Sequence, residues 1–144
     1  MKIADSPEFL ESVANHPRVF PFVSCKGITE IGFGDKWADC IGLEWDDGGF
    51  VFHRQDEGVY EVHTLFLPGA KDAAGKAQQA RCHMFDVVGA TLLLTQVPRD
   101  LPHVRRFAEK AGFKWFGEAK GAFVRESGPV DVDYFEMERQ GCPQ

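Results

Sequence analysis

The chain contains 144 residues, of which 44% are apolar and 26% charged, a composition typical of one globular domain and too small for two independent cores. Its 22 acidic and 16 basic residues give a formal charge of -6, which argues against a surface that neutralises many phosphates and so against a nucleic-acid partner. No apolar run reaches the roughly 20 residues that span a bilayer, and residues 1–12 lack the apolar stretch of a signal peptide, so we expect a cytoplasmic protein without membrane association.

The spacing of cysteines and histidines supports neither a disulfide framework nor a metal centre. No C-x-x-C pair occurs, and a domain of this size buries enough core without disulfides. The sequence therefore predicts reduced thiols at all four cysteines, Cys25, Cys40, Cys82 and Cys142. The five histidines show no paired spacing with cysteines or carboxylates, so we expect no metal site.

A helix and a weakly patterned segment come first in the chain. A cap at Asp5 or Ser6 predicts a helix that ends at residues 15–17. Residues 17–24 then predict a short strand, and the glycine-rich residues 25–36 predict an irregular segment.

Strands dominate the next part of the chain. Alternating apolar residues predict strands at residues 38–45, 49–55 and 59–68. The short turns between them indicate an antiparallel meander. The third strand ends in three consecutive apolar residues before Pro68, which predicts a central position in the sheet.

The second half of the sequence alternates helices and strands. Apolar spacing predicts a helix over residues 73–89, capped by Gly89, and the apolar run 90–97 predicts a buried strand. Asp100 as a cap predicts a further helix, which ends at Gly112. The last two predicted strands are residues 114–125 and 130–138. This order predicts an α+β fold with at least one crossover.

Residues 59–80 (VYEVHTLFLPGAKDAAGKAQQA) and 91–118 resemble the GNAT superfamily of acetyl-CoA-dependent N-acetyltransferases, most sharply at RFAEKAGF. The sequence looks especially like the short acetyltransferase-like proteins of phage and prophage genomes. The resemblance implies one GNAT-like domain over residues 1–144, with a mixed, mostly antiparallel sheet flanked by helices. It also implies a sheet splayed between the strand ending at Pro68 and the strand 90–97, with CoA in the cleft.

Residues 69–77 are the predicted binding segment for acetyl-CoA, which would act as co-substrate. A strand that leads through small residues into a helix presents unpaired N–H groups, and these suit a diphosphate. The cofactor-binding residues implied by the resemblance are Leu65, Phe66, Leu67, Lys71, Ala74, Gly75, Lys76 and Ala77. The family pattern R/Q-x-x-G-x-G/A fits in part, because Asp72 stands at the Arg/Gln position. We therefore expect Lys71 and Lys76 to make the charged contacts and Asp72 to turn away as a helix cap; the alternative is a capped core helix with no ligand.

Glu61 and His63 are the predicted catalytic residues, because they lie two residues apart and so share one face of a strand. Either could take the proton from an acceptor ammonium before direct acyl transfer, and the alternative is a structural pair. Where the family often has an asparagine and a tyrosine acid, this chain has Leu101 and Ala108.

Other residues could supply parts of such a site. Tyr60 or Tyr134 could replace the missing acid, whereas Cys82 lacks an activating neighbour for a role as nucleophile. Three basic residues form a solvated surface or contact the adenosine 3′-phosphate; they are Arg105, Arg106 and Lys110.

The sequence thus predicts an acyl-CoA-dependent N-acyltransferase with an unknown small-molecule or protein amine as acceptor. The acidic surface favours a cationic acceptor such as a polyamine, an aminoglycoside or a lysine side chain. The alternatives are a catalytically inactive GNAT-fold binding or assembly module of phage origin and a CoA-independent interaction domain. Exposed members of an aromatic cluster near the C-terminus could form a homodimer face; the cluster is Phe113, Trp115, Phe116, Phe123, Tyr134 and Phe135.

Overall fold

A computed structural model of the protein describes residues 1–139 and Cys142. Its helices are α1 (Glu8–Ala14), α2 (Phe20–Val23), α3 (Ala73–Cys82) and α4 (Pro102–Ala111), with a 3₁₀ helix η1 (Gly34–Asp39) and a π-helical turn η2 (His83–Val88). Its strands are β1 (Lys2–Ile3), β2 (Cys40–Trp45), β3 (Gly48–Asp56), β4 (Val59–Phe66), β5 (Leu92–Pro98), β6 (Lys114–Arg125) and β7 (Gly128–Glu138). None of the helices in this part of the chain is long and apolar enough to cross a membrane.

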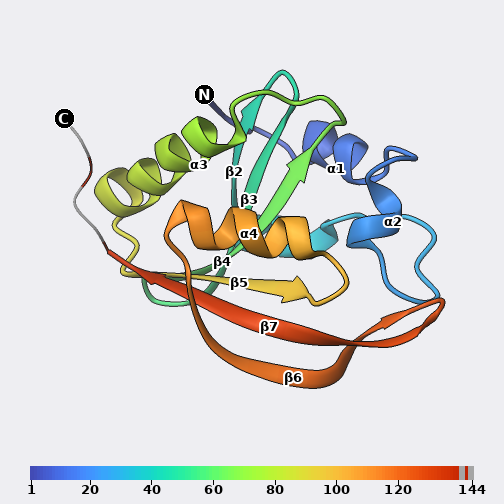
Figure 1. Ribbon diagram of the computed structural model, residues 1–144. Coiled ribbons are helices and arrows are strands. Elements are labelled where there is room, and N and C mark those ends of the chain that lie inside the picture. Colours follow the sequence, from blue (N-terminus) through green and yellow to red (C-terminus); the bar gives the residue numbers. More distant parts are fainter. Residues whose placement is uncertain (140–141, 143–144) are drawn as a thin grey trace.

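The strands form one seven-stranded sheet in the order β1-β2-β3-β4-β5-β7-β6 (Figure 1). All neighbours run antiparallel except β4 and β5, which are parallel and joined through α3. The predicted α+β class, the meander and the mixed, mostly antiparallel sheet flanked by helices are confirmed. β4 lies at the centre of the sheet, as its apolar end predicted.

The parallel strands β4 and β5 pair over only a short stretch. Their register joins Val59–Glu61 to Leu92–Leu94, and both strands continue beyond it without pairing to each other. Figure 1 shows β4 and β5 diverging from this shared end. The sheet is therefore splayed at the place that the resemblance implied.

The two faces of the sheet carry separate cores because alternate residues of β3 and β4 point to opposite sides. Phe52 and Val62 pack with Ala80 of α3. Val51 and Leu65 pack on the other side against α1. We call these the α3/α4 face and the α1 face.

One predicted strand and two predicted helix caps are wrong. Residues 17–24 contain α2 and no strand, since Pro21 stands in the first turn of that helix, where its missing N–H costs nothing. Neither Asp5 nor Ser6 caps α1, whose N-cap is Pro7 without a side-chain bond. Asp100 does not cap α4 either.

The carboxylate of Asp100 instead accepts hydrogen bonds from Arg125 at the end of β6, at 2.8 and 3.1 Å. The N-cap of α4 is Leu101, which makes no side-chain cap bond. A cap preference in the sequence was thus overridden by a contact between residues far apart in the chain. The predicted glycine caps at Gly89 and Gly112 are confirmed, and both have left-handed backbone angles.

The prediction of four reduced thiols is wrong for one pair. Cys82 at the end of α3 forms a disulfide with Cys142, 60 residues away in sequence. Cys25 and Cys40 are free thiols. No motif marks the paired cysteines; the end of β7 lies near the end of α3, where Arg139 contacts Phe85, and Cys142 is close to Cys82 in space only through the tertiary structure.

Candidate functional site

Glu61 and His63 lie side by side on the α1 face of β4, as their spacing predicted. The Nε2 atom of His63 is 3.4 Å from Oε1 of Glu61, within ion-pair reach but longer than a good hydrogen bond. The Glu61 side chain is 20% exposed and that of His63 is 45% exposed, so a molecule from solvent can reach both.

The environment of His63 favours its neutral form. Protein atoms around the imidazole remove part of its hydration, and this partial desolvation lowers the pKa of His63 below its ordinary value of 6.5; Glu61 opposes the shift, while nearby His53 and Lys36 add to it. A neutral imidazole beside a carboxylate can accept a proton near neutral pH.

Gln96 of β5 completes this group, although the sequence analysis did not identify it. Its Nε2 donates a hydrogen bond to Oε2 of Glu61 at 3.0 Å, across the place where β4 and β5 begin to diverge. The signal that could have identified Gln96 is a polar amide within the apolar run 90–97. Tyr134 of β7 stands opposite Gln96 in the register and so shares the α1 face with Glu61, whereas Tyr60 packs in the core on the α3/α4 face.

We call the region where β4 and β5 diverge the splay. A cavity of about 50 Å³ lies there on the α3/α4 face of the sheet. Its walls include Val62 of β4 and Thr95 of β5, and the hydroxyl of Thr95 donates to the carbonyl oxygen of Val62 at 3.3 Å. Ala108 also lines the cavity and is 6% exposed, so the position where the family often has a tyrosine offers no acid here. Leu101 is 8% exposed at the start of α4 and offers none either.

Arg81 of α3 brings a polar group to this cavity. Its Nη1 donates to the carbonyl of Ala111 at 3.4 Å, and its buried Nε has no partner in residues 1–139 or Cys142. An orphaned N–H donor beside apolar walls suits a narrow ligand with apolar links and carbonyl oxygens. The splay therefore presents an apolar wall with one orphaned hydrogen-bond donor.

Residues 69–77, which we call the α3 entry segment, are held by the chain's own carboxylates. Asp72 caps α3 as predicted, accepting from the N–H of Gly75 at 3.1 Å. Lys76 forms an ion pair with Asp47 of the β2–β3 turn, at 2.6 Å, and donates to the carbonyl of Lys71 at 2.7 Å. Its side chain is 15% exposed, so Lys76 is not free for a phosphate in this arrangement.

The α3 entry segment therefore fits a diphosphate poorly. A diphosphate needs unpaired N–H groups and free cations, and here the chain itself occupies Gly75 and Lys76. The Lys71 side chain stays exposed, and its N–H donates to Asp47 at 3.2 Å.

The other predicted cofactor residues fall in different surroundings. Ala77 lines the cavity. Phe66 lies under the Lys76 ammonium, 5.6 Å from its ring centre. Leu65 and Leu67 belong to the core on the opposite, α1 face, and Ala74 lies in the first turn of α3.

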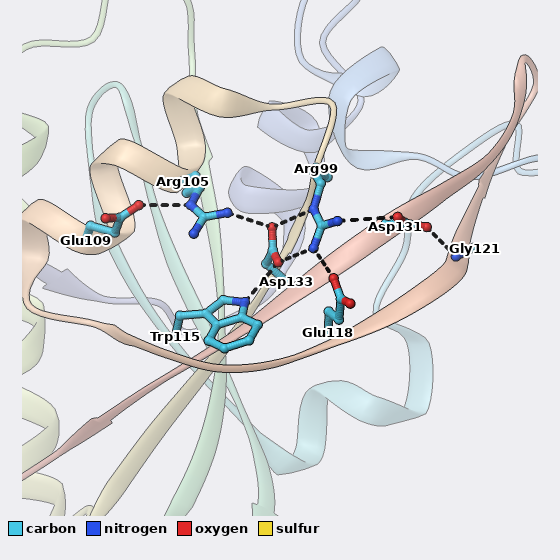
Figure 2. Close-up of polar contacts among 8 residues, drawn as sticks. All are labelled: Arg99, Arg105, Glu109, Trp115, Glu118, Gly121, Asp131 and Asp133. Atoms are coloured by element: carbon cyan, nitrogen blue, oxygen red, sulfur yellow. Dashed lines mark hydrogen bonds and ion pairs between the residues drawn. The ribbon is translucent and has the colours of Figure 1, made fainter.

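Arg105, expected on a solvated surface, belongs instead to a polar network around Asp133 of β7 (Figure 2). Asp133 is fully buried and accepts from Arg99 at 2.7 Å, from Arg105 at 3.1 Å and from Trp115 at 2.9 Å. Glu118 and Asp131 bind the outer side of Arg99. This network joins α4, β6 and β7 to Arg99, the residue that follows β5, and the carboxylates of Asp133 and Glu109 already pair with Arg105.

The aromatic cluster is core in part only. Phe135 is fully buried, whereas Trp115 is 51% and Phe116 50% exposed on β6. The Phe116 ring also contacts Tyr134, with ring centres 6.0 Å apart.

Comparison of the sequence with protein-family models gives no match, and neither does comparison with curated proteins. Solved structures do resemble the fold. A spermidine N-acetyltransferase SpeG chimera from Vibrio cholerae and hSSAT has a TM-score of 0.61 at 15% identity, covering 69% of this chain and 65% of that chain. SpeG from Vibrio cholerae in complex with manganese ions has a TM-score of 0.62 at 16% identity, covering 69% and 64%.

The acetyltransferase (GNAT family) from Bacillus anthracis has a TM-score of 0.60 at 19% identity, covering 69% of this chain and 66% of that chain. The match thus spans less than two thirds of the length of the Vibrio proteins. At these identities the likeness is one of fold, and it is the fold that the resemblance implied.

Proposed function

We propose that this chain, which has the GNAT fold, is an N-acyltransferase that moves an acyl group from an acyl-CoA thioester to an amine by direct transfer. The observation that carries the proposal is the polar group of Glu61, His63 and Gln96 at the edge of the splay, with a cavity behind it. An acyl thioester supplies an activated carbonyl, and the protein supplies a base and an orientation.

In this proposal Glu61 takes the proton from the acceptor ammonium, so that the amine lone pair becomes free. Gln96 holds the second carboxylate oxygen and fixes the direction of the first. His63 stays neutral beside it and does not compete as a cation for the carboxylate. Tyr134 is the proposed acid for the departing sulfur, because it shares this face and no hydroxyl stands at Ala108.

The acceptor, the location and the assembly remain proposals. The structural neighbours include spermidine N-acetyltransferases and a dodecameric form of one from Vibrio cholerae. We propose an amine acceptor and a homodimer face around Trp115 and Phe116. A cytoplasmic location and a likeness to phage proteins also remain predictions, and the disulfide of Cys82 would be unusual in a reducing cytosol.

Ligand-dependent unfolding tests the proposal first. Acetyl-CoA and CoA should raise the melting temperature progressively with concentration, because a ligand that binds only the native state stabilises it by mass action. The absence of any shift at millimolar ligand would contradict the proposal.

Substitution of the base tests the chemistry. Glu61→Gln should lower acetyl transfer in an amine panel about 100-fold or more, since a general base commonly contributes that much. Glu57→Gln is the matched control, because Glu57 lies exposed in the turn before β4, and it should keep its rate. Unchanged turnover in Glu61→Gln would remove Glu61 as the base.

One observation favours a second candidate, an inactive GNAT-fold binding or assembly module. Ala108 lines the cavity where the family often has its acid. A thermal shift with acetyl-CoA but no transfer to any amine would support this candidate.

A further inference from the structure

The first turn of α3 is closed by a carboxylate from a distant turn. Asp47 lies between β2 and β3, and its two oxygens receive the Lys76 ammonium at 2.6 and 2.8 Å and the Lys71 N–H at 3.2 Å. The backbone carbonyl of Asp47 also accepts from the N–H of Leu67 at 2.8 Å. These contacts join the β2–β3 turn to the loop between β4 and α3.

A second carboxylate fills the space over Gly75. Asp72 has a left-handed backbone, with φ of 53°, which places its carboxylate over the helix start. A Cβ added to Gly75 would come closer than 3.0 Å to that carboxylate. The glycine therefore makes room for Asp72, and the room is not open to a ligand phosphate.

Together these contacts weaken what makes a helix N-terminus attract anions. Three of its donors are the N–H of Lys71, the N–H of Gly75 and the ammonium of Lys76, and each already has a carboxylate partner. The charges of Asp47 and Asp72 balance those of the two lysines. A diphosphate would meet a neutral surface with its best hydrogen-bond donors taken.

The splay is arranged differently, because within residues 1–139 and Cys142 no carboxylate pairs with the orphaned Nε of Arg81 beside the apolar cavity. We infer that this chain selects its acyl donor by the neutral pantetheine arm and not by the diphosphate, with Asp47 and Asp72 as the residues that set this specificity. The inference rests on the proposed function. It predicts that acyl thioesters with and without the nucleotide are bound about equally well.

Calorimetric titration of the wild-type chain with CoA and with pantetheine tests this inference without an activity assay. The two dissociation constants should agree within about threefold. CoA binding tenfold or more tighter than pantetheine would overturn the inference and leave the proposed function intact. Binding of neither ligand would overturn the proposed function, and the inference with it.

Asp47→Asn should increase the affinity of the chain for CoA. The amide keeps an acceptor for Lys71 but removes the charge that neutralises Lys76, so CoA should bind about fivefold to tenfold tighter while pantetheine is unaffected. Asp46→Asn is the control, since it removes the same charge from the exposed neighbouring residue, and CoA affinity should change less than twofold. An Asp47→Asn variant with no gain for CoA, or with an equal gain for pantetheine, would overturn the inference.

Discussion

Single side chains carry the proposed chemistry, and the state of His63 makes its pH dependence predictable. Protonation of His63 would place a cation 3.4 Å from Glu61 and hold the carboxylate that must accept the substrate proton. We therefore expect kcat/KM to fall on acidification, with a midpoint below 6.5 because partial desolvation lowers the pKa of His63. A pH profile between about pH 5 and 8 measures this.

His63→Asn should remove this inflection while keeping a rate at neutral pH. His103→Asn, on α4 where its ring contacts Phe22, is the matched control and should retain the wild-type profile. An inflection that survives in His63→Asn would assign the titration to another group.

At the scale of elements, the network around Asp133 holds α4, β6 and β7 together with Arg99, the residue that follows β5 (Figure 2). Asp133→Asn leaves the guanidinium groups of Arg99 and Arg105 without their shared counter-charge. We expect a loss of about 2 kcal/mol in the free energy of unfolding, measured by urea denaturation. Glu109→Gln, which breaks an exposed pair with Arg105, should cost less than about 0.5 kcal/mol.

The same network predicts a dependence of stability on acid. Arg99 first, and Trp115 and Arg105 with it, hold the pKa of Asp133 below its ordinary value of 3.8. A carboxyl group whose pKa is lower in the folded state stabilises the fold above the unfolded value, and this contribution is lost as the pH falls through the folded value. Melting temperatures measured below about pH 4 should therefore fall less steeply in Asp133→Asn than in the wild type.

At the scale of the whole molecule, the disulfide between Cys82 and Cys142 joins the end of α3 to a residue 60 positions later in the chain. Arg139 supports the same junction through the carbonyl of Phe85 and the carboxylate of Asp86. Reduction should lower the free energy of unfolding by about 2–4 kcal/mol, because the bond restricts the unfolded chain. Thermal unfolding with and without a reductant measures this loss.

Cys82→Ser should unfold at the temperature of the reduced protein and lose its sensitivity to the reductant. Cys25→Ser removes an exposed free thiol and should leave that sensitivity unchanged. A wild-type chain that unfolds at one temperature under both conditions would contradict a stabilising bond.

Local sequence patterns predicted the helices and strands better than they predicted which side chains contact one another. The strands β2 to β7 and the helices α3 and α4 followed from apolar spacing and from glycine caps such as Gly89, whereas β1 was not predicted. The shared face of Glu61 and His63 followed from the period of a strand. By sequence, Asp100 fitted the role of N-cap for α4, but in the structure its carboxylate binds Arg125 instead. Local sequence rules could not predict this contact, because Arg125 is 25 residues away in the chain.

The sequence by itself determined the α+β class, the order of the elements from β2 to β7 and the shared strand face of Glu61 and His63, because helix and strand periods depend on neighbours a few residues apart. Only the tertiary structure decided which charges meet. It brought Asp47 to Lys76 across 29 residues and Gln96 to Glu61 across 35 residues. The physical reason is that the pairing of charges depends on distance in space, which a sheet with a crossover sets almost independently of distance along the chain.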